Sequence, residues 1–196
     1  MAMIRLIIIL FSIVSLNTYA DSIDQATQLV EDKCHHCHGY KGEASNVIYP
    51  RLAAQDKAYM IKQLSNFKSG ERLGTMNEMA KDLSESDIIA LADYFSQQPA
   101  LTHKVRNSDL NAVGKYIFHK GNKYSGVPAC ASCHGKDGAG TIKLPRLAGQ
   151  HKRYISSQLE EFNLRKRTND NVIMHSIASK LTELEREAVA LYASGL

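Results

Sequence analysis

The sequence has no tryptophan, no low-complexity run and no large excess of charge of either sign. Its formal net charge is +4 at pH 7, and a charge this small and evenly spread argues against nucleic acid as a partner. After residue 20 no stretch approaches the roughly 20 apolar residues that cross a bilayer. No alternating apolar run of strand length stands out either. These absences predict an all-α chain that is soluble once mature.

The first 20 residues differ from the rest of the chain. A positive charge at Arg5 precedes an apolar run from Leu6 to Leu16, and a small residue, Ala20, closes the segment. This order is typical of a secretory signal peptide, and the run is too short for a spanning helix. We therefore predict that residues 1–20 are a cleavable signal peptide of an exported protein. The alternative is an uncleaved N-terminal anchor.

The remainder of the chain repeats itself. The segment PRLAAQDKAYMIKQLSNFK from Pro50 matches PRLAGQHKRYISSQLEEFN from Pro145, an offset of 95 residues. Further on, a segment from Met76 matches one from Met174, and the larger offset of 98 indicates a short insertion in a loop. A tandem match of this kind predicts one small domain that has been duplicated.

The duplication sets the expected organisation. We predict an N-terminal domain over residues 21–98 and a C-terminal domain over residues 99–196, joined at the polar segment around Pro99. Each domain should contain three or four helices. Expected helical segments are 22–33, 57–68, 111–121 and 152–163, and terminal helices should follow the capping-box pairs Ser84–Asp87 and Thr182–Glu185.

All four cysteines fall in two copies of Cys-x-x-Cys-His, at residues 34–38 and 130–134. Two disulfides are the ordinary alternative for an exported protein, but they do not require a histidine after each second cysteine. Thioredoxin-like chemistry uses Cys-x-x-Cys on a βαβ background that is absent here. The usual zinc sites place their ligand pairs farther apart than this motif does.

Cys-x-x-Cys-His is the attachment signal of c-type haem. Two thiols one helical turn apart form thioethers with the two vinyl groups of one porphyrin, and the adjacent imidazole then reaches the iron. A buried porphyrin would also supply the core that a domain of about 80 residues lacks. We predict two covalent c-type haems, attached through Cys34, Cys37, Cys130 and Cys133, with proximal iron ligands His38 and His134.

The sixth iron position decides the chemistry of such a haem. Met76 and Met174 are the methionines that stand in register in both halves, and each precedes a terminal helix by a short loop. We predict that they are the sixth ligands. The alternatives are core methionines and, for the first half, Met79 in place of Met76. Met60 is expected to lie in the core.

Other polar and proline positions also recur. A carbonyl fixed at Pro50 or Pro145 could accept the Nδ1 proton of the proximal histidine. Two interpretations of the repeated polar residues remain open: they bind haem propionates, or they cap and pack helices. These residues are Arg51, Gln55 and Tyr59, with their counterparts Arg146, Gln150 and Tyr154.

Both halves resemble the cytochrome c4 family of bacterial periplasmic dihaem cytochromes. The resemblance covers the whole predicted mature chain, and it is most specific in VPACASCHGKDGAG, PRLAGQHKRYISSQL, KRTNDNVIMHSIASKL and the closing SGL. The first half departs in its CHHCHG motif and in a loop before Met76 that is three residues shorter. The resemblance implies two tandem class I cytochrome c domains, each with His–Met iron.

The resemblance also implies a function. A periplasmic electron carrier without substrate chemistry would pass electrons from a respiratory donor complex to a terminal oxidase, and peripheral membrane association is compatible with that role. The alternative is a dihaem cytochrome subunit of a periplasmic dehydrogenase, such as a flavocytochrome c sulfide dehydrogenase. A haem peroxidase or gas sensor would require an open sixth position.

Overall fold

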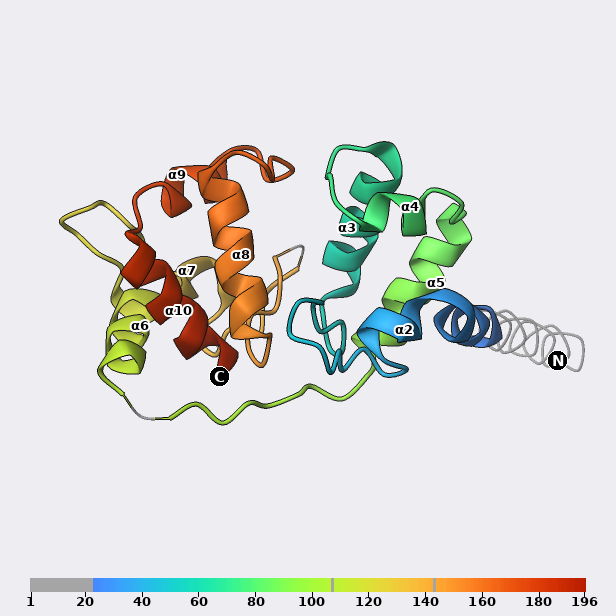
Figure 1. The fold of residues 1–196 in the computed structure, drawn as a ribbon, viewed down its shortest axis with the longest axis horizontal. Coiled ribbons are helices and arrows are strands. Elements are labelled where there is room, and N and C mark those ends of the chain that lie inside the picture. The colour runs from blue at the N-terminus through green and yellow to red at the C-terminus, as the bar shows by residue number, and fades with distance from the viewer. Residues whose placement is uncertain (1–22, 107, 143) are drawn as a thin grey trace, which may run out of the picture.

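The computed structural model describes residues 23–106, 108–142 and 144–196, so the predicted signal peptide lies outside the described residues. The regular structure in these ranges is helical, apart from the isolated bridges Asn122–Val127 and Thr141–Leu144. The helices form two groups, one for each repeat, and Figure 1 shows an extended segment that connects them along one edge. In the described part of the chain no helix is long and apolar enough to cross a membrane.

The N-terminal half packs helix α3 against helices α4 and α5. Residues 23–29 are helical and continue into a π-helical turn that leads to the first cysteine motif. In chain order the elements are η1 (Val30–Cys34), α2 (His35–His38), α3 (Lys57–Ser69), α4 (Met76–Ala80) and α5 (Glu85–Ser96). The core of this half consists of Val30, Met60, Ala80, Leu83, Ile88, Leu91, Ala92 and Phe95. Met60 is therefore a core residue, as predicted.

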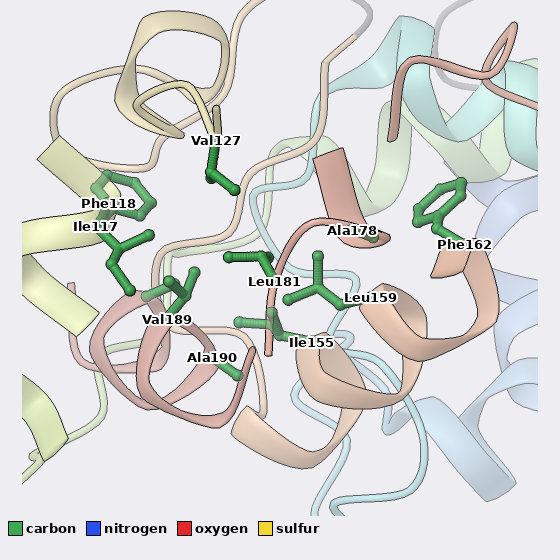
Figure 2. Packing of buried hydrophobic residues seen from close by; sticks show 11 residues of the cluster. Ile117, Phe118, Val127, Ile155, Leu159, Phe162, Ala178, Leu181, Val189 and Ala190 are labelled. Atoms are coloured by element: carbon green, nitrogen blue, oxygen red, sulfur yellow. The ribbon is translucent and has the colours of Figure 1, made fainter. Parts of the chain in front are cut away.

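The C-terminal half packs α10 against both α6 and α8, and α9 against α8. Its elements are α6 (Asp109–Lys120), α7 (Ala131–His134), α8 (Lys152–Asn163), α9 (Ile173–Ala178) and α10 (Glu183–Ser194). Figure 2 shows the buried side chains of this core, which come from α6, α8, α9 and α10 and from the connecting segments. Phe118 of α6 is fully buried.

Both predicted capping boxes are present and fix where the terminal helices begin. Ser84 Oγ accepts the Asp87 N–H at 3.1 Å, and the Asp87 carboxylate accepts the Ser84 N–H at 2.8 Å. Thr182 and Glu185 make the same pair of bonds at 3.3 and 2.8 Å. Each box satisfies donors that a helix N-terminus otherwise leaves free.

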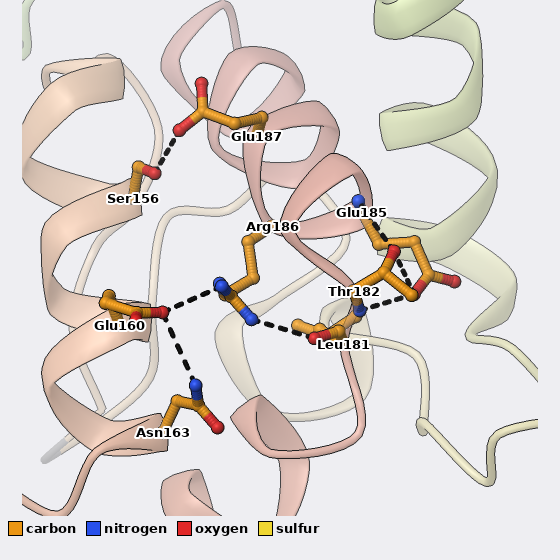
Figure 3. A network of polar contacts seen from close by, with 8 residues as sticks. All are labelled: Ser156, Glu160, Asn163, Leu181, Thr182, Glu185, Arg186 and Glu187. Atoms are coloured by element: carbon orange, nitrogen blue, oxygen red, sulfur yellow. Dashed lines mark hydrogen bonds and ion pairs between the residues drawn. The ribbon is translucent and has the colours of Figure 1, made fainter.

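Polar contacts join α8 to α10 (Figure 3). Arg186 pairs with Glu160 at 2.8 Å and also donates to the Leu181 carbonyl at 2.9 Å. Ser156 donates to Glu187. Because Arg186 lies in the first turn after the capping box, these contacts orient the start of α10 on α8.

The two halves are joined by reciprocal glutamine contacts. Gln55 donates to the Arg146 carbonyl at 3.1 Å and accepts the Arg146 N–H at 2.7 Å. Gln150 makes the equivalent bonds to Arg51, at 2.9 and 2.8 Å. These recurring residues therefore bond across the junction of the two halves, an arrangement that neither interpretation of the repeat anticipated.

Helices α6 and α10 lie in close contact at Gly114. A Cβ atom at this position would lie 2.0 Å from the Ala188 carbonyl oxygen and 2.9 Å from the Tyr192 Cβ. The carbonyl group of Ala188 belongs to the backbone of α10, so it cannot move away from an added Cβ atom unless the helix moves with it. Only glycine fits at this position, because a side chain would have no space between the two helices. Ala188 and Phe118 are buried where the helices cross.

We expect Gly114→Ala to destabilise the protein by about 1–3 kcal/mol, the usual cost of overpacking, although alanine favours helix by about 1 kcal/mol. Denaturant unfolding of the purified protein measures this difference. Val113→Ala, on the exposed side of the same helix, is the control and should change stability much less. A Gly114→Ala variant as stable as the parent would contradict the tight crossing.

Candidate haem sites

The cysteine motifs lie on short helical segments. Cys34 ends η1 and Cys37 lies in α2, on one continuous helical stretch, while Cys130 immediately precedes α7 and Cys133 lies within it. Residues three apart on a helix share a face, so both thiols of a motif are presented together. All four thiols are free. Burial raises the pKa values of Cys34 and Cys130 to about 11, so these thiols are protonated at neutral pH.

The histidine of each motif is buried and bonded to a proline carbonyl. His38 Nδ1 lies 2.9 Å from the Pro50 oxygen, and His134 Nδ1 lies 3.1 Å from the Pro145 oxygen. A carbonyl can only accept, so Nδ1 carries the proton and Nε2 keeps its lone pair. Burial lowers the pKa of both histidines, which keeps the rings neutral. The hydrogen bond expected from the position of each proline is therefore present.

The two methionines occupy equivalent places. Met76 is the first residue of α4 and Met174 is the second residue of α9, and both are half-buried. A short helix, α4 or α9, lies where the sequence predicted only a short loop between each methionine and the terminal helix. Met174 packs against the C-terminal core. Met79, one turn further along α4, exposes 47% of its surface.

Polar residues that sequence reasoning missed hold each methionine in place. Asn77 accepts the Gly74 N–H at 2.7 Å and donates to the Arg72 carbonyl at 2.9 Å, which fixes the backbone just before Met76. In the other half the Asp170 carboxylate accepts the Met174 N–H. Asn77 and Asp170 are not equivalent positions of the repeat, so a comparison of the two halves did not indicate a role for either residue.

A buried polar cluster lies at the junction of the halves. Its centre is formed by the guanidinium groups of Arg72 and Arg167, which are 7% and 6% exposed. Each guanidinium stacks on a phenylalanine of its own half at 4.5 Å, Phe67 for Arg72 and Phe162 for Arg167. Among the described residues no carboxylate lies within ion-pair distance of either group. Amide and phenol oxygens therefore solvate these two cations.

The residues of each motif fit a c-type haem. Two free thiols on one helix face suit thioether formation, and a buried neutral imidazole with its Nδ1 proton already donated presents Nε2 to a metal. In the described ranges no three His, Cys, Asp or Glu side chains are arranged so that they could hold a metal ion by themselves.

Comparison with known proteins agrees with this geometry. The family model for cytochrome c matches residues 112–195, and the model described as cytochrome c oxidase, cbb3-type, subunit III matches residues 21–95. The cytochrome c4 of Thiocapsa roseopersicina is 38% identical to the chain over 167 residues, which cover 83% of this chain and 86% of the relative. The chain belongs to the cytochrome c4 family.

Further relatives support and extend the assignment. The crystal structure of reduced recombinant cytochrome c4 from Pseudomonas stutzeri has a TM-score of 0.82 and 33% identity to the chain, and it covers 88% of this chain and 97% of that one. A thiosulfate dehydrogenase electron acceptor from Thiomonas intermedia (strain K12) is 34% identical over 80% of this chain and 75% of its own length. As a member of the cytochrome c4 family, this chain is a dihaem electron-transfer protein with two tandem cytochrome c domains and two c-type haems.

Proposed function

We propose that the chain is a periplasmic carrier of single electrons between respiratory partners. Residues 1–20 direct its export, and residues 21–98 and 99–196 each hold one haem. Cys34, Cys37, Cys130 and Cys133 attach the haems, His38 and His134 are the proximal ligands, and Met76 and Met174 are the sixth ligands.

The observation that carries this proposal is the buried histidine bonded to a proline carbonyl in each half. The Nδ1 proton is held at 2.9 Å from the Pro50 oxygen and at 3.1 Å from the Pro145 oxygen, so neither ring can rotate or change tautomer without losing that bond. A donated Nδ1 proton also makes Nε2 a stronger donor to a metal. The haem supplies iron that takes up and releases one electron.

The half-buried methionines support transfer without other chemistry. A thioether on the side of the haem opposite the histidine would close the iron to small molecules and raise its reduction potential. Asn77 and Asp170 hold the backbone beside the two thioethers. A pair of closed sites leaves no position for a substrate, so the residues favour a carrier over a peroxidase or gas sensor.

The purified exported protein should carry two covalent haems, because both motifs are intact and all four thiols are free. Intact-protein mass spectrometry should show the mature chain plus two haem masses, and acid–acetone extraction should leave the colour with the protein. Cys133→Ala should lower the covalent attachment of one haem only. A mass corresponding to one haem or none would refute the proposed attachment.

Met76→Ala and Met174→Ala should each open one iron, so that carbon monoxide binds one haem of the reduced protein. Met79→Ala is the matched control, since this exposed residue lies one turn away on the same helix, and it should leave both irons closed. Carbon monoxide titration followed by absorption measures the number of open sites. If Met79→Ala opened a site and Met76→Ala did not, the first ligand would be misassigned.

The acceptor is proposed to be a terminal oxidase. The second candidate, an electron-accepting partner of a periplasmic dehydrogenase, is favoured by the likeness to the thiosulfate dehydrogenase electron acceptor of Thiomonas intermedia. Membranes with an active terminal oxidase should oxidise the ferrous protein rapidly, and cyanide should stop the reaction. No oxidation by the membranes, together with copurification of a dehydrogenase, would favour the second candidate.

A further inference from the structure

Each methionine follows a loop that reaches into the buried cluster between the halves. We define the methionine loops as residues 70–75, which connect α3 to Met76, and residues 164–172, which connect α8 to the helix carrying Met174. The first loop contains Arg72 and the second contains Arg167. Figure 1 shows α3 and α8 facing each other across the junction, with a methionine loop at the end of each.

The first methionine loop is bonded to the C-terminal half. Arg72 Nη2 donates to the Tyr154 hydroxyl at 3.1 Å and to the Gln158 side-chain oxygen at 2.7 Å, and both acceptors belong to α8. Within its own half the Arg72 side chain donates to Gln63 at 2.7 Å. Two of these three bonds therefore depend on the other repeat.

The second methionine loop makes the reciprocal contacts to the N-terminal half. Arg167 Nη2 donates to the Tyr59 hydroxyl at 2.9 Å and to Gln63 at 3.0 Å, and both acceptors belong to α3. Asn169 of the same loop donates to Gln63 at 3.1 Å and to Asn66 at 2.8 Å. Tyr59 and Tyr154 thus play equivalent parts for opposite loops.

Short paths connect these cross-junction bonds to the methionines. The Arg72 carbonyl accepts from Asn77, the residue that follows Met76. In the second loop Arg167 Nε donates to Asn169 at 3.1 Å, and the next residue, Asp170, accepts the Met174 N–H. A shift of either guanidinium would therefore displace the backbone that carries the thioether.

The burial of the guanidinium groups makes these bonds hard to replace. A buried charged donor that loses its acceptor pays the full cost of desolvation, which exceeds the loss of an exposed bond. Acceptors of the opposite half therefore contribute to the position of each loop, beside Gln63 for Arg72 and Gln158 for Arg167 within their own halves.

We propose that Arg72 and Arg167 are positioning residues for the sixth iron ligands, and that each half holds the methionine loop of the other. The inference rests on the proposed ligation by Met76 and Met174. In this arrangement the ligation of each haem depends on residues of the other half. Methionine binding at one iron is therefore coupled through the junction to methionine binding at the other.

Tyrosine-to-phenylalanine variants test this crossed dependence. Tyr154→Phe removes one acceptor of Arg72 with little change of shape, and it should raise the rate of carbon monoxide binding at the N-terminal haem. Tyr59→Phe should do the same at the C-terminal haem. We expect an increase of roughly three- to tenfold, as for the loss of one hydrogen bond of ordinary strength. Arg72→Lys and Arg167→Lys, which keep the charge but lose the forked geometry, should give larger effects on the haem of their own half.

The two haems are distinguished by proton NMR of the reduced protein, in which each ligating methionine gives its own ring-shifted methyl signal. Met76→Ala and Met174→Ala assign the two signals. Gln55→Leu is the control, because Gln55 crosses the junction to Arg146 without touching a methionine loop, and it should leave both binding rates near the parent value.

Three outcomes would overturn the inference. In the first, Tyr154→Phe acts on the haem of its own half. In the second, both tyrosine variants leave carbon monoxide binding unchanged, and in the third, Gln55→Leu opens both irons equally. Failure of the proposed function looks different, because Met76→Ala or Met174→Ala would then abolish no methyl signal and open no iron.

Discussion

The junction between the halves depends on one constraint: two buried guanidinium groups must find hydrogen-bond acceptors, and both halves supply them. Arg72 and Arg167 are met by amide and phenol oxygens of α3 and α8, and Gln63 and Gln158 each accept from both of them. Removing the opposite half would expose both cations and leave a polar face on each repeat. Polar contacts therefore join the two halves, whereas the hydrophobic residues form a separate core in each half.

Within each half the proposed proximal ligand is supported by a backbone carbonyl. Pro50 and Pro145 lie outside the helices, so no helical hydrogen bond uses their carbonyls. The carbonyls of Pro50 and Pro145 are thus left for the histidine rings, and each ring keeps one tautomer. The sixth side is organised differently, by Asn77 in one half and Asp170 in the other, because the two methionine loops differ in length.

Features that depend on residues close together in the sequence were predictable. The cysteine motifs, the two capping boxes and the helical segments each depend on residues within a few positions, so pattern and spacing identified them. The junction depends on contacts between residues about 80 to 110 positions apart, such as Arg72 with Tyr154 and Tyr59 with Arg167. Its residues are polar, so no apolar stripe marks them as buried. The repeat showed that Arg51, Gln55 and Tyr59 recur, but recurrence alone could not show that each copy binds the other half.

The side chains at the junction repeat almost symmetrically in the two halves, but the loops that lead to the two methionines differ. The paired arginines, glutamines and tyrosines repeat at one offset of 95 residues, whereas the methionine loops, residues 70–75 and 164–172, do not match in length. The longer loop adds Asn169, which makes two further bonds to α3. Met76 and Met174 therefore lie beside similar junction contacts, but the loops that lead to them are constrained differently, by Asn77 in one half and by Asp170 in the other.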